Sequence, residues 1–198
     1  MRLAEFNHDI KRMRLRGLAV TLTLLGVAQL AGGFHGEWLR YSRMAIEQGQ
    51  FWRLLTAHLV HYDVAHATLN AAGLILLWLL FVADARPRQW AVVTLVSALS
   101  ISIGLWYQHP EIEWYLGLSG VLHGLWAAAS LSAIARWRLE AMVSGSLLAA
   151  KLIFEQHYGA LSDPLLGHTL HVVTEAHVYG ALGGLTAALL YWRSQIRK

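Results

Sequence analysis

The chain has 198 residues, of which 56% are hydrophobic and 14% charged, whereas a soluble domain usually carries about a quarter charged residues. This composition argues against an ordinary soluble domain, and the absence of cysteine excludes disulfides and a thiolate nucleophile. The formal net charge of +4 does not indicate a nucleic-acid partner, because most basic residues fall into clusters between long apolar runs.

These apolar runs predict helices that cross a lipid bilayer. Five windows contain no Asp, Glu, Lys or Arg, and a spanning helix needs about 20 mostly apolar residues. A sixth, weaker run is interrupted by Lys151 and Glu155. We therefore expect an all-α, polytopic membrane protein, a six-transmembrane-helix bundle forming one domain over residues 1–198. In chain order, the expected spans are 17–34, 64–83, 89–107, 118–135, 141–157 and 172–192.

The basic clusters predict the orientation of the bundle. If the first of six spans begins inside the cell, all four clusters fall on the cytoplasmic side, as the positive-inside rule requires. Both termini are then expected in the cytoplasm. The first apolar run follows a basic segment as in a signal peptide, but it lacks a clear cleavage site near Ala31 and is expected to be retained. The clusters lie at 2–16, 86–88, 136–138 and 193–198.

The first outer loop, residues 35–62, mixes aromatic, charged and apolar residues. This pattern predicts short helices lying in the membrane interface, with Trp38 and Trp52 as anchors. Arg53 is expected to hold this loop to a lipid phosphate or to a loop carbonyl.

The second, fourth and sixth predicted spans run inward and bring polar side chains to one depth. At about 1.5 Å per residue, Ser119 and His177 lie about 25 and 24 Å above the charged inner ends of their helices. By the same measure His66 and Asn70 lie about 27 and 21 Å up. Polar groups inside a bilayer are costly and usually mark function, so this layer is the candidate functional site.

The residue types in this layer suit a serine hydrolase. His177 could accept the Ser119 proton as a general base. His66 and Asn70 are four residues apart on one helical face and could donate hydrogen bonds to a developing oxyanion.

Small residues would allow the helices that carry Ser119 and His177 to touch. Gly120 and Gly180 each begin a Gly-x-x-x-Gly pair, a spacing that permits close helix packing in membranes. Gly117 is expected to leave open backbone beside Ser119 for a substrate peptide.

Sequence spacing places no carboxylate beside His177. Glu175 is two positions earlier and projects about 200° away on a helix, so a Ser–His dyad is expected rather than a triad. Lys151 and Glu155, four residues apart, are expected to pair with each other inside the bundle. Contact with a substrate is the alternative role for this pair.

At these residues the sequence resembles the rhomboid intramembrane serine proteases. Three segments carry the resemblance, in the order and spacing of the family's six-helix core. They are "GQFWRLLTAHLVHYDVAHATLN" (49–70), "GLSGVLHG" (117–124) and "AHVYGALGG" (176–184).

The resemblance implies a rhomboid-like fold and a role for each matching residue. Ser119 would be the nucleophile and His177 its base. His66 and Asn70, with the Ser119 backbone N–H, would hold the oxyanion, and His61 matches a loop histidine that is usually structural. No cofactor is implied.

Within the family, "GLSGVLHGLWAA", "KLIFEQHYG" and "EAHVYGALGGL" are most similar to rhombosortases. The resemblance implies a bacterial inner-membrane endopeptidase whose active site faces the periplasm. Its substrates would be transmembrane proteins with a C-terminal Gly-Gly sorting tail, cleaved near the glycines. Two residues depart from typical rhomboids: His123, where many members have a tyrosine that stacks on the catalytic histidine, and Tyr179.

Two other functions stay open on the sequence. The chain could be a non-catalytic rhomboid-like membrane binding protein. The complete set of catalytic residue types argues against this alternative. It could also be a histidine-rich metal-binding membrane protein, because six of its eleven histidines are expected near the outer face. The preferred interpretation includes no metal. The six histidines expected near the outer face are His58, His61, His66, His168, His171 and His177.

Overall fold

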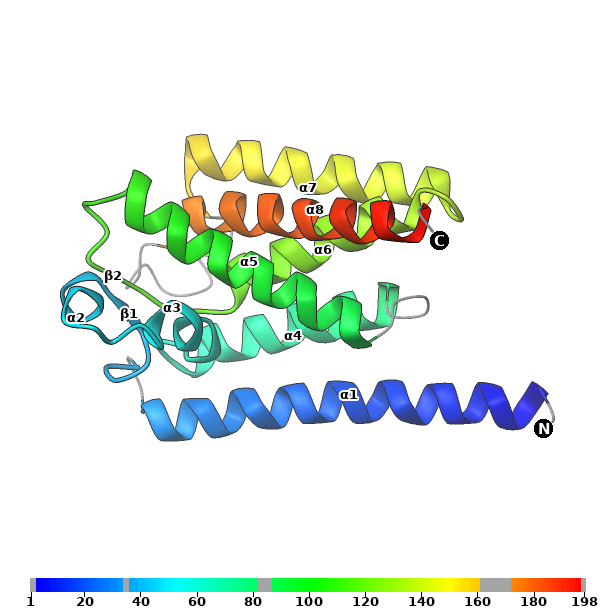
Figure 1. Cartoon of the computed structure of the whole chain (residues 1–198), viewed down its shortest axis with the longest axis horizontal. Helices are drawn as coiled ribbons and strands as arrows, with labels where there is room; N and C mark the ends of the chain where they lie inside the picture. Colours follow the sequence, from blue (N-terminus) through cyan, green and yellow to red (C-terminus); the bar gives the residue numbers. More distant parts are fainter. Residues whose placement is uncertain (1–2, 34–35, 82–86, 161–171, 197–198) are drawn as a thin grey trace.

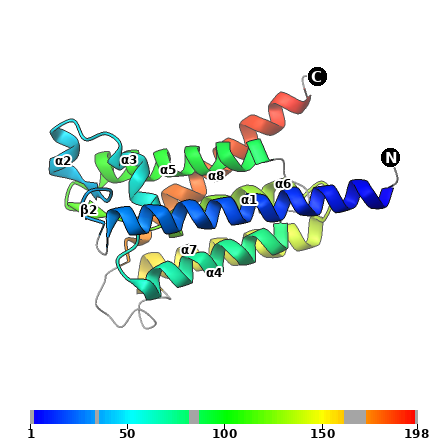
Figure 2. The same cartoon turned by 90° about the horizontal axis from the view of Figure 1, so that it is seen from below.

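The computed structural model describes residues 3–33, 36–81, 87–160 and 172–196. Within these ranges, six long helices run lengthwise through the molecule, and short elements gather at one end (Figure 1). Both chain termini lie at the opposite end (Figures 1 and 2). The long helices are α1 Leu3–Gly32, α4 Val64–Phe81, α5 Pro87–Gln108, α6 Ser119–Ala133, α7 Arg138–Tyr158 and α8 Thr174–Ile196.

Each predicted span coincides with one of these helices. The largest difference is at α1, which begins at Leu3 rather than near residue 17, because the basic segment continues the helix. Among the described residues, α4 and α5 are both long and apolar enough to cross a membrane. Helix length and hydropathy thus identify two spans in the described residues, not the six expected; α6, for example, has only 15 residues.

The short elements belong to the loop after α1 and to the segment before α6. As expected, the loop contains short helices, and Trp38 and Trp52 are exposed. A two-stranded antiparallel sheet, in which Tyr41 pairs with Tyr115, was not expected. It ties the loop to the segment that leads into α6. The elements are β1 Tyr41–Ser42, α2 Arg43–Glu47, α3 Arg53–Thr56, η1 Ala57–Leu59 and β2 Trp114–Tyr115.

Arg53 holds this loop together from within. Its guanidinium is buried and donates to the carbonyls of Glu37 at 2.7 Å and Arg40 at 2.9 Å, and to Gln50 Oε1 at 2.8 Å. Of the two anchors expected for Arg53, the structure shows the loop carbonyl.

Helix α6 lies at the centre of the bundle and packs against α4, α5, α7 and α8. Its side chains are buried around almost its whole circumference. Helix α1 lies outside, along α4, where Gly17 faces the ring of Trp78. Many leucines on the outer faces of α4, α5, α7 and α8 are exposed, as expected of helices surrounded by lipid rather than water.

Helices α6 and α8 are in contact through their backbones, and at the glycines of this contact there is no room for a side chain. A Cβ on Gly180 would lie 1.9 Å from the carbonyl oxygen of Gly120, and one on Gly184 would lie 2.0 Å from that of Gly124. The two predicted Gly-x-x-x-Gly pairs therefore face each other directly, as inferred from their spacing.

We expect Gly184→Ala to destabilise the protein by about 1–3 kcal/mol, because the added methyl meets backbone that cannot move aside. Gly26→Ala is the matched control, since nothing lies within 4 Å of a Cβ at that position in α1. Thermal unfolding in detergent micelles measures both. A Gly184→Ala midpoint equal to that of Gly26→Ala would contradict the close packing.

Buried His58 links the loop to α5. It is 2% exposed, and its Nε2 donates to the Ala98 carbonyl at 3.1 Å and lies 3.3 Å from Ser102 Oγ. Burial lowers the pKa of His58 to about 4, because the charged imidazolium loses its hydration. His61 also has its pKa lowered to about 4 by burial.

Because its pKa is lowered on folding, His58 should make the free energy of unfolding decrease as the pH is lowered. An unfolded histidine titrates near 6.5, so its neutral form favours folding fully above that pH, and this contribution is lost between pH 6.5 and about 4. The loss is about 3 kcal/mol. Chemical denaturation in micelles at several pH values should show this dependence of the free energy of unfolding on pH, and His58→Gln should make it shallower. An unchanged slope in His58→Gln would contradict the assignment.

Candidate active site

Four helices bring their ends together where the short elements gather. Helices α4, α6 and α8 begin at this end of the bundle, and α7 ends there (Figure 1). Ser119 is the first residue of α6, while His66 and His177 lie in the first turns of α4 and α8. Asp63 caps α4 by accepting from the His66 backbone N–H at 2.8 Å. The polar layer expected from the sequence is therefore formed by helix starts.

The backbone before Ser119 is held in an irregular conformation. Gly117 has a φ of +121°, which favours glycine, and its N–H donates to the Ala57 carbonyl at 2.9 Å. The Tyr115 hydroxyl donates to the Gly117 carbonyl at 2.9 Å, and burial raises the pKa of Tyr115, which keeps this donor protonated.

Ser119 and His177 form a hydrogen bond across the α6–α8 contact. Ser119 Oγ lies 2.9 Å from His177 Nε2, and His177 Nδ1 lies 2.8 Å from Glu155 Oε2. Because the carboxylate can only accept, Nδ1 carries the proton and Nε2 faces the serine hydroxyl as an acceptor. The expectation that no carboxylate orients His177 was wrong. Glu155 does so from α7, a different helix.

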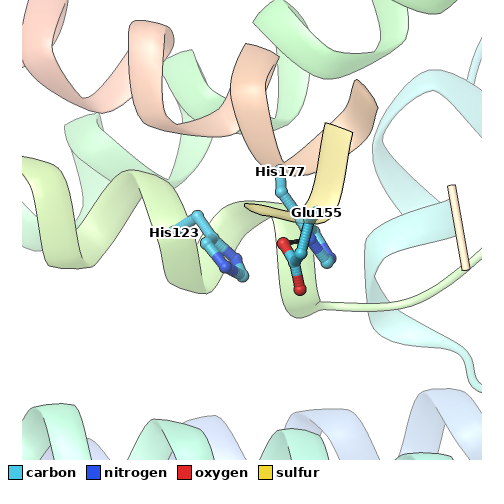
Figure 3. Close-up of side chains that lie close together, drawn as sticks. All are labelled: His123, Glu155 and His177. Carbon is cyan, nitrogen blue, oxygen red and sulfur yellow. Dashed lines mark hydrogen bonds and ion pairs between the residues drawn. The ribbon is translucent and has the colours of Figure 1, made fainter. Parts of the chain in front are cut away.

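Two further side chains close the chain of hydrogen bonds into a ring. Lys151 donates to Glu155 Oε1, as the expected pairing requires, and also to His123 Nε2 at 2.9 Å. His123 Nδ1 in turn donates to the Ser119 carbonyl at 2.8 Å. Figure 3 shows His123, Glu155 and His177 converging from α6, α7 and α8. We call the five residues of this ring, Ser119, His177, Glu155, Lys151 and His123, the polar ring.

The two imidazoles of the polar ring are stacked. The centroids of His123 and His177 are 4.1 Å apart, with an interplanar angle of 12°. His123 therefore takes the stacking position expected of the family's tyrosine, and both of its nitrogens are hydrogen-bonded as well.

The residues expected to hold an oxyanion lie in the same cavity as Ser119, and in the described part of the chain neither side chain is hydrogen-bonded to it. Asn70 is buried, and its Nδ2 donates to the His66 carbonyl at 3.1 Å. The His66 ring has a buried Nδ1 without a hydrogen-bond partner among the described residues. Both side chains line the same cavity as Ser119 and His177.

His66 also fills the space at Gly117. A Cβ on Gly117 would lie 2.8 Å from His66 Cε1, so the expectation of open backbone at Gly117 for a substrate was wrong. The imidazole takes that space because Gly117 has no side chain. His61 packs edge-on against His66, with centroids 5.2 Å apart, and its backbone N–H donates to Gln29 Oε1 at 2.7 Å. His61 thus connects α1, the loop and His66.

Tyr179 is turned away from the site. Its hydroxyl lies 3.1 Å from His109 Nε2, and its ring covers Gly104 on α5. It does not line the cavity at Ser119, so in this structure it packs α8 against α5 rather than forming part of a substrate path.

The cavity at Ser119 has a volume of about 980 Å³ and lies between α4 and α7. Its polar end holds Ser119, His177, Lys151 and Asn70. The rest of its wall consists mainly of apolar side chains from α4 and α7. Such a groove suits an apolar segment with one polar point of contact.

His123, Glu155 and His177 lie close enough to share a metal ion, since their candidate ligand atoms fall within 4.8 Å of one another. In the structure, however, each of these groups already has a hydrogen-bond partner, and the Lys151 ammonium stands beside them as the cation. The expected His168 and His171 pair lies outside the described residues.

The chain is similar to one known family of proteins. A family model described as Rhomboid domain matches residues 48–194. A search of curated proteins finds no match to this chain. The family match, together with the apolar helices α4 and α5, indicates a membrane protein. The chain therefore belongs to the rhomboid family, whose members are in general intramembrane serine proteases that act on transmembrane proteins.

Proposed function

We propose that this chain is an intramembrane serine endopeptidase in which Ser119 is the nucleophile and His177 the general base. The observation that carries the proposal is the 2.9 Å contact between Ser119 Oγ and His177 Nε2, with the proton on the opposite ring nitrogen. Attack by Oγ on a peptide carbonyl carbon would pass the hydroxyl proton to Nε2. That proton would then go to the leaving amine, and water would hydrolyse the acyl-enzyme.

The negative oxygen of the tetrahedral intermediate would be held by the Ser119 backbone N–H with His66 and Asn70. Support comes from the position of Ser119 as the first residue of α6, where backbone N–H groups lack intrahelical partners. His66 and Asn70 line the cavity beside it. Each such donor contributes about 3 kcal/mol in serine proteases.

The substrate proposed for this site is a transmembrane protein with a C-terminal Gly-Gly tail, as in the rhombosortases. The groove between α4 and α7 is lined mainly by apolar side chains and includes Ser119, which suits a helix entering from the lipid. Glycines at its end would unwind readily for attack, because glycine weakens helices.

The proposed placement is a bacterial inner membrane, with one domain of six spans and the active site facing the periplasm. The short elements and Ser119 lie at the end of the bundle opposite both termini (Figure 1). The basic clusters would then lie on the cytoplasmic side.

A fluorophosphonate probe should label the purified protein covalently, because Ser119 is activated by a hydrogen-bonded base. Ser119→Ala should abolish labelling. Ser146→Ala removes the same hydroxyl from an exposed position on α7 and should leave labelling unchanged. Mass spectrometry of labelled peptides locates the adduct, and labelling that persists in Ser119→Ala would refute the nucleophile assignment.

A membrane-anchored reporter ending in a Gly-Gly motif, an apolar helix and a basic end should be cleaved when it is co-expressed with the wild type. The Ser119→Ala variant should leave it intact, and mass spectrometry of the released C-terminus should place the cut near the glycines. A reporter whose two glycines are replaced by leucines is the control. Equal cleavage of both reporters would argue against the proposed substrate.

A further inference from the structure

Lys151 and Glu155, the charged pair on α7, have contacts that a purely structural role would not require. The Glu155 side chain is 1% exposed and that of Lys151 26% exposed, and burying such charges is costly. If pairing were their only role, contact with each other would suffice. Instead, each of the two binds a different one of the stacked imidazoles: Glu155 binds His177 and Lys151 binds His123.

We propose that Glu155 is the third member of a Ser119–His177–Glu155 triad, and that Lys151 is its positioning partner, which keeps the carboxylate in place and locks the tautomer of His123. This inference rests on the proposed function. It adds two residues to the two expected from the sequence.

The geometry specifies what Glu155 does during the reaction. As Ser119 Oγ bonds to the carbonyl carbon, its proton moves to His177 Nε2, and the Nδ1 proton stays on the ring. The resulting imidazolium points its Nδ1–H at the Glu155 carboxylate, 2.8 Å away. The positive charge is thereby stabilised as it forms. Before the reaction, the same bond holds the ring with Nε2 free to accept.

Lys151 acts in the opposite sense on the charge of His177. Its ammonium repels an imidazolium and partly cancels the carboxylate, while it holds both Glu155 and His123 by hydrogen bonds. His123 is neutral in this arrangement, because it donates from Nδ1 and accepts at Nε2. Among the residues that the structure describes, two further titratable groups are His66, which lines the same cavity as His177, and Glu175, which lies in the first turn of α8. Neither is changed in the variants below.

The test measures the rate of fluorophosphonate labelling of Ser119 in full-length protein, as a function of pH. Labelling of the wild type should fall on acidification as His177 is protonated. Glu155→Gln should lower the maximum rate at least about 100-fold, and should move the half-maximal rate to lower pH, because Lys151 then disfavours the imidazolium unopposed. Lys151→Met should move the half-maximal rate to higher pH, since the carboxylate is no longer offset.

Glu113→Gln makes the same chemical change at an exposed loop position and should match the wild type in both readouts. Glu155→Asp keeps the charge and should recover part of the rate lost in Glu155→Gln. Should Glu155→Gln fail to fold, the double variant Lys151→Met/Glu155→Gln removes both charges together and should still label at least about 10-fold more slowly than the wild type.

The opposite directions of the two pH shifts separate a triad from a merely structural pair, which would lower the amount of folded protein without moving the pH dependence. The inference is overturned if Glu155→Gln, or the double variant in its place, labels like Glu113→Gln. It is also overturned if the two single variants shift the half-maximal rate in the same direction. Absence of labelling in the wild type would instead refute the proposed function.

Discussion

The contact between α6 and α8 is the constraint on which the site depends. Gly120 follows Ser119 directly, and Gly180 lies three residues after His177, so the glycine contact stands next to the reactive pair on both helices. A Cβ placed on Gly180 would lie only 1.9 Å from the carbonyl oxygen of Gly120. Any side chain at either glycine would separate the helices, and a hydrogen bond weakens steeply once its atoms move apart. Backbone packing therefore sets the Ser119–His177 distance.

The polar ring shows how ionised groups can be accommodated in an apolar bundle. One carboxylate and one ammonium cancel in net charge, and the hydrogen bonds of the ring use both carboxylate oxygens and all four nitrogens of the two imidazoles. A fully satisfied polar network is stable inside a protein, whereas removing one member leaves an unpaired group. The same bonds leave each histidine with a single tautomer. Charge compensation and orientation of His177 are thus achieved by the same five side chains.

The sequence predicted the part of the site that depends on regular helical geometry. Helical rise is constant, so depths counted along three helices expected to run inward place Ser119, His177 and His66 in one layer, and in the structure the three residues line one cavity. Sequence spacing does not indicate Glu155, because spacing relates residues of one helix, and only packing decides which face of α7 meets α8. The sequence does contain one signal, since an acidic and a basic residue four apart in an apolar run mark a polar position on α7, although they could also pair only with each other.

Two features of the local backbone could not be predicted from sequence spacing either. A two-residue strand has too few positions to show alternation, so the pairing of Tyr41 with Tyr115 left no pattern in the sequence. At Gly117 the sequence predicts room for a substrate. The structure fills that room with His66, a residue distant in sequence. Which neighbour occupies the space beside a glycine is a property of the whole fold.

The shortness of α6 connects these features to the proposed reaction. Its 15 residues span about 22 Å at 1.5 Å per residue, less than the bilayer's hydrocarbon thickness of about 30 Å. Under the proposed topology, Ser119 then lies below the outer surface, and the non-helical segment before it lies at membrane depth. Irregular backbone is tolerated there only where protein covers it. The bonds from Gly117 to Ala57 and from Tyr115 to Gly117 provide that cover. In the proposed topology, the loop after α1 would therefore allow α6 to begin, with Ser119 as its first residue, below the membrane surface.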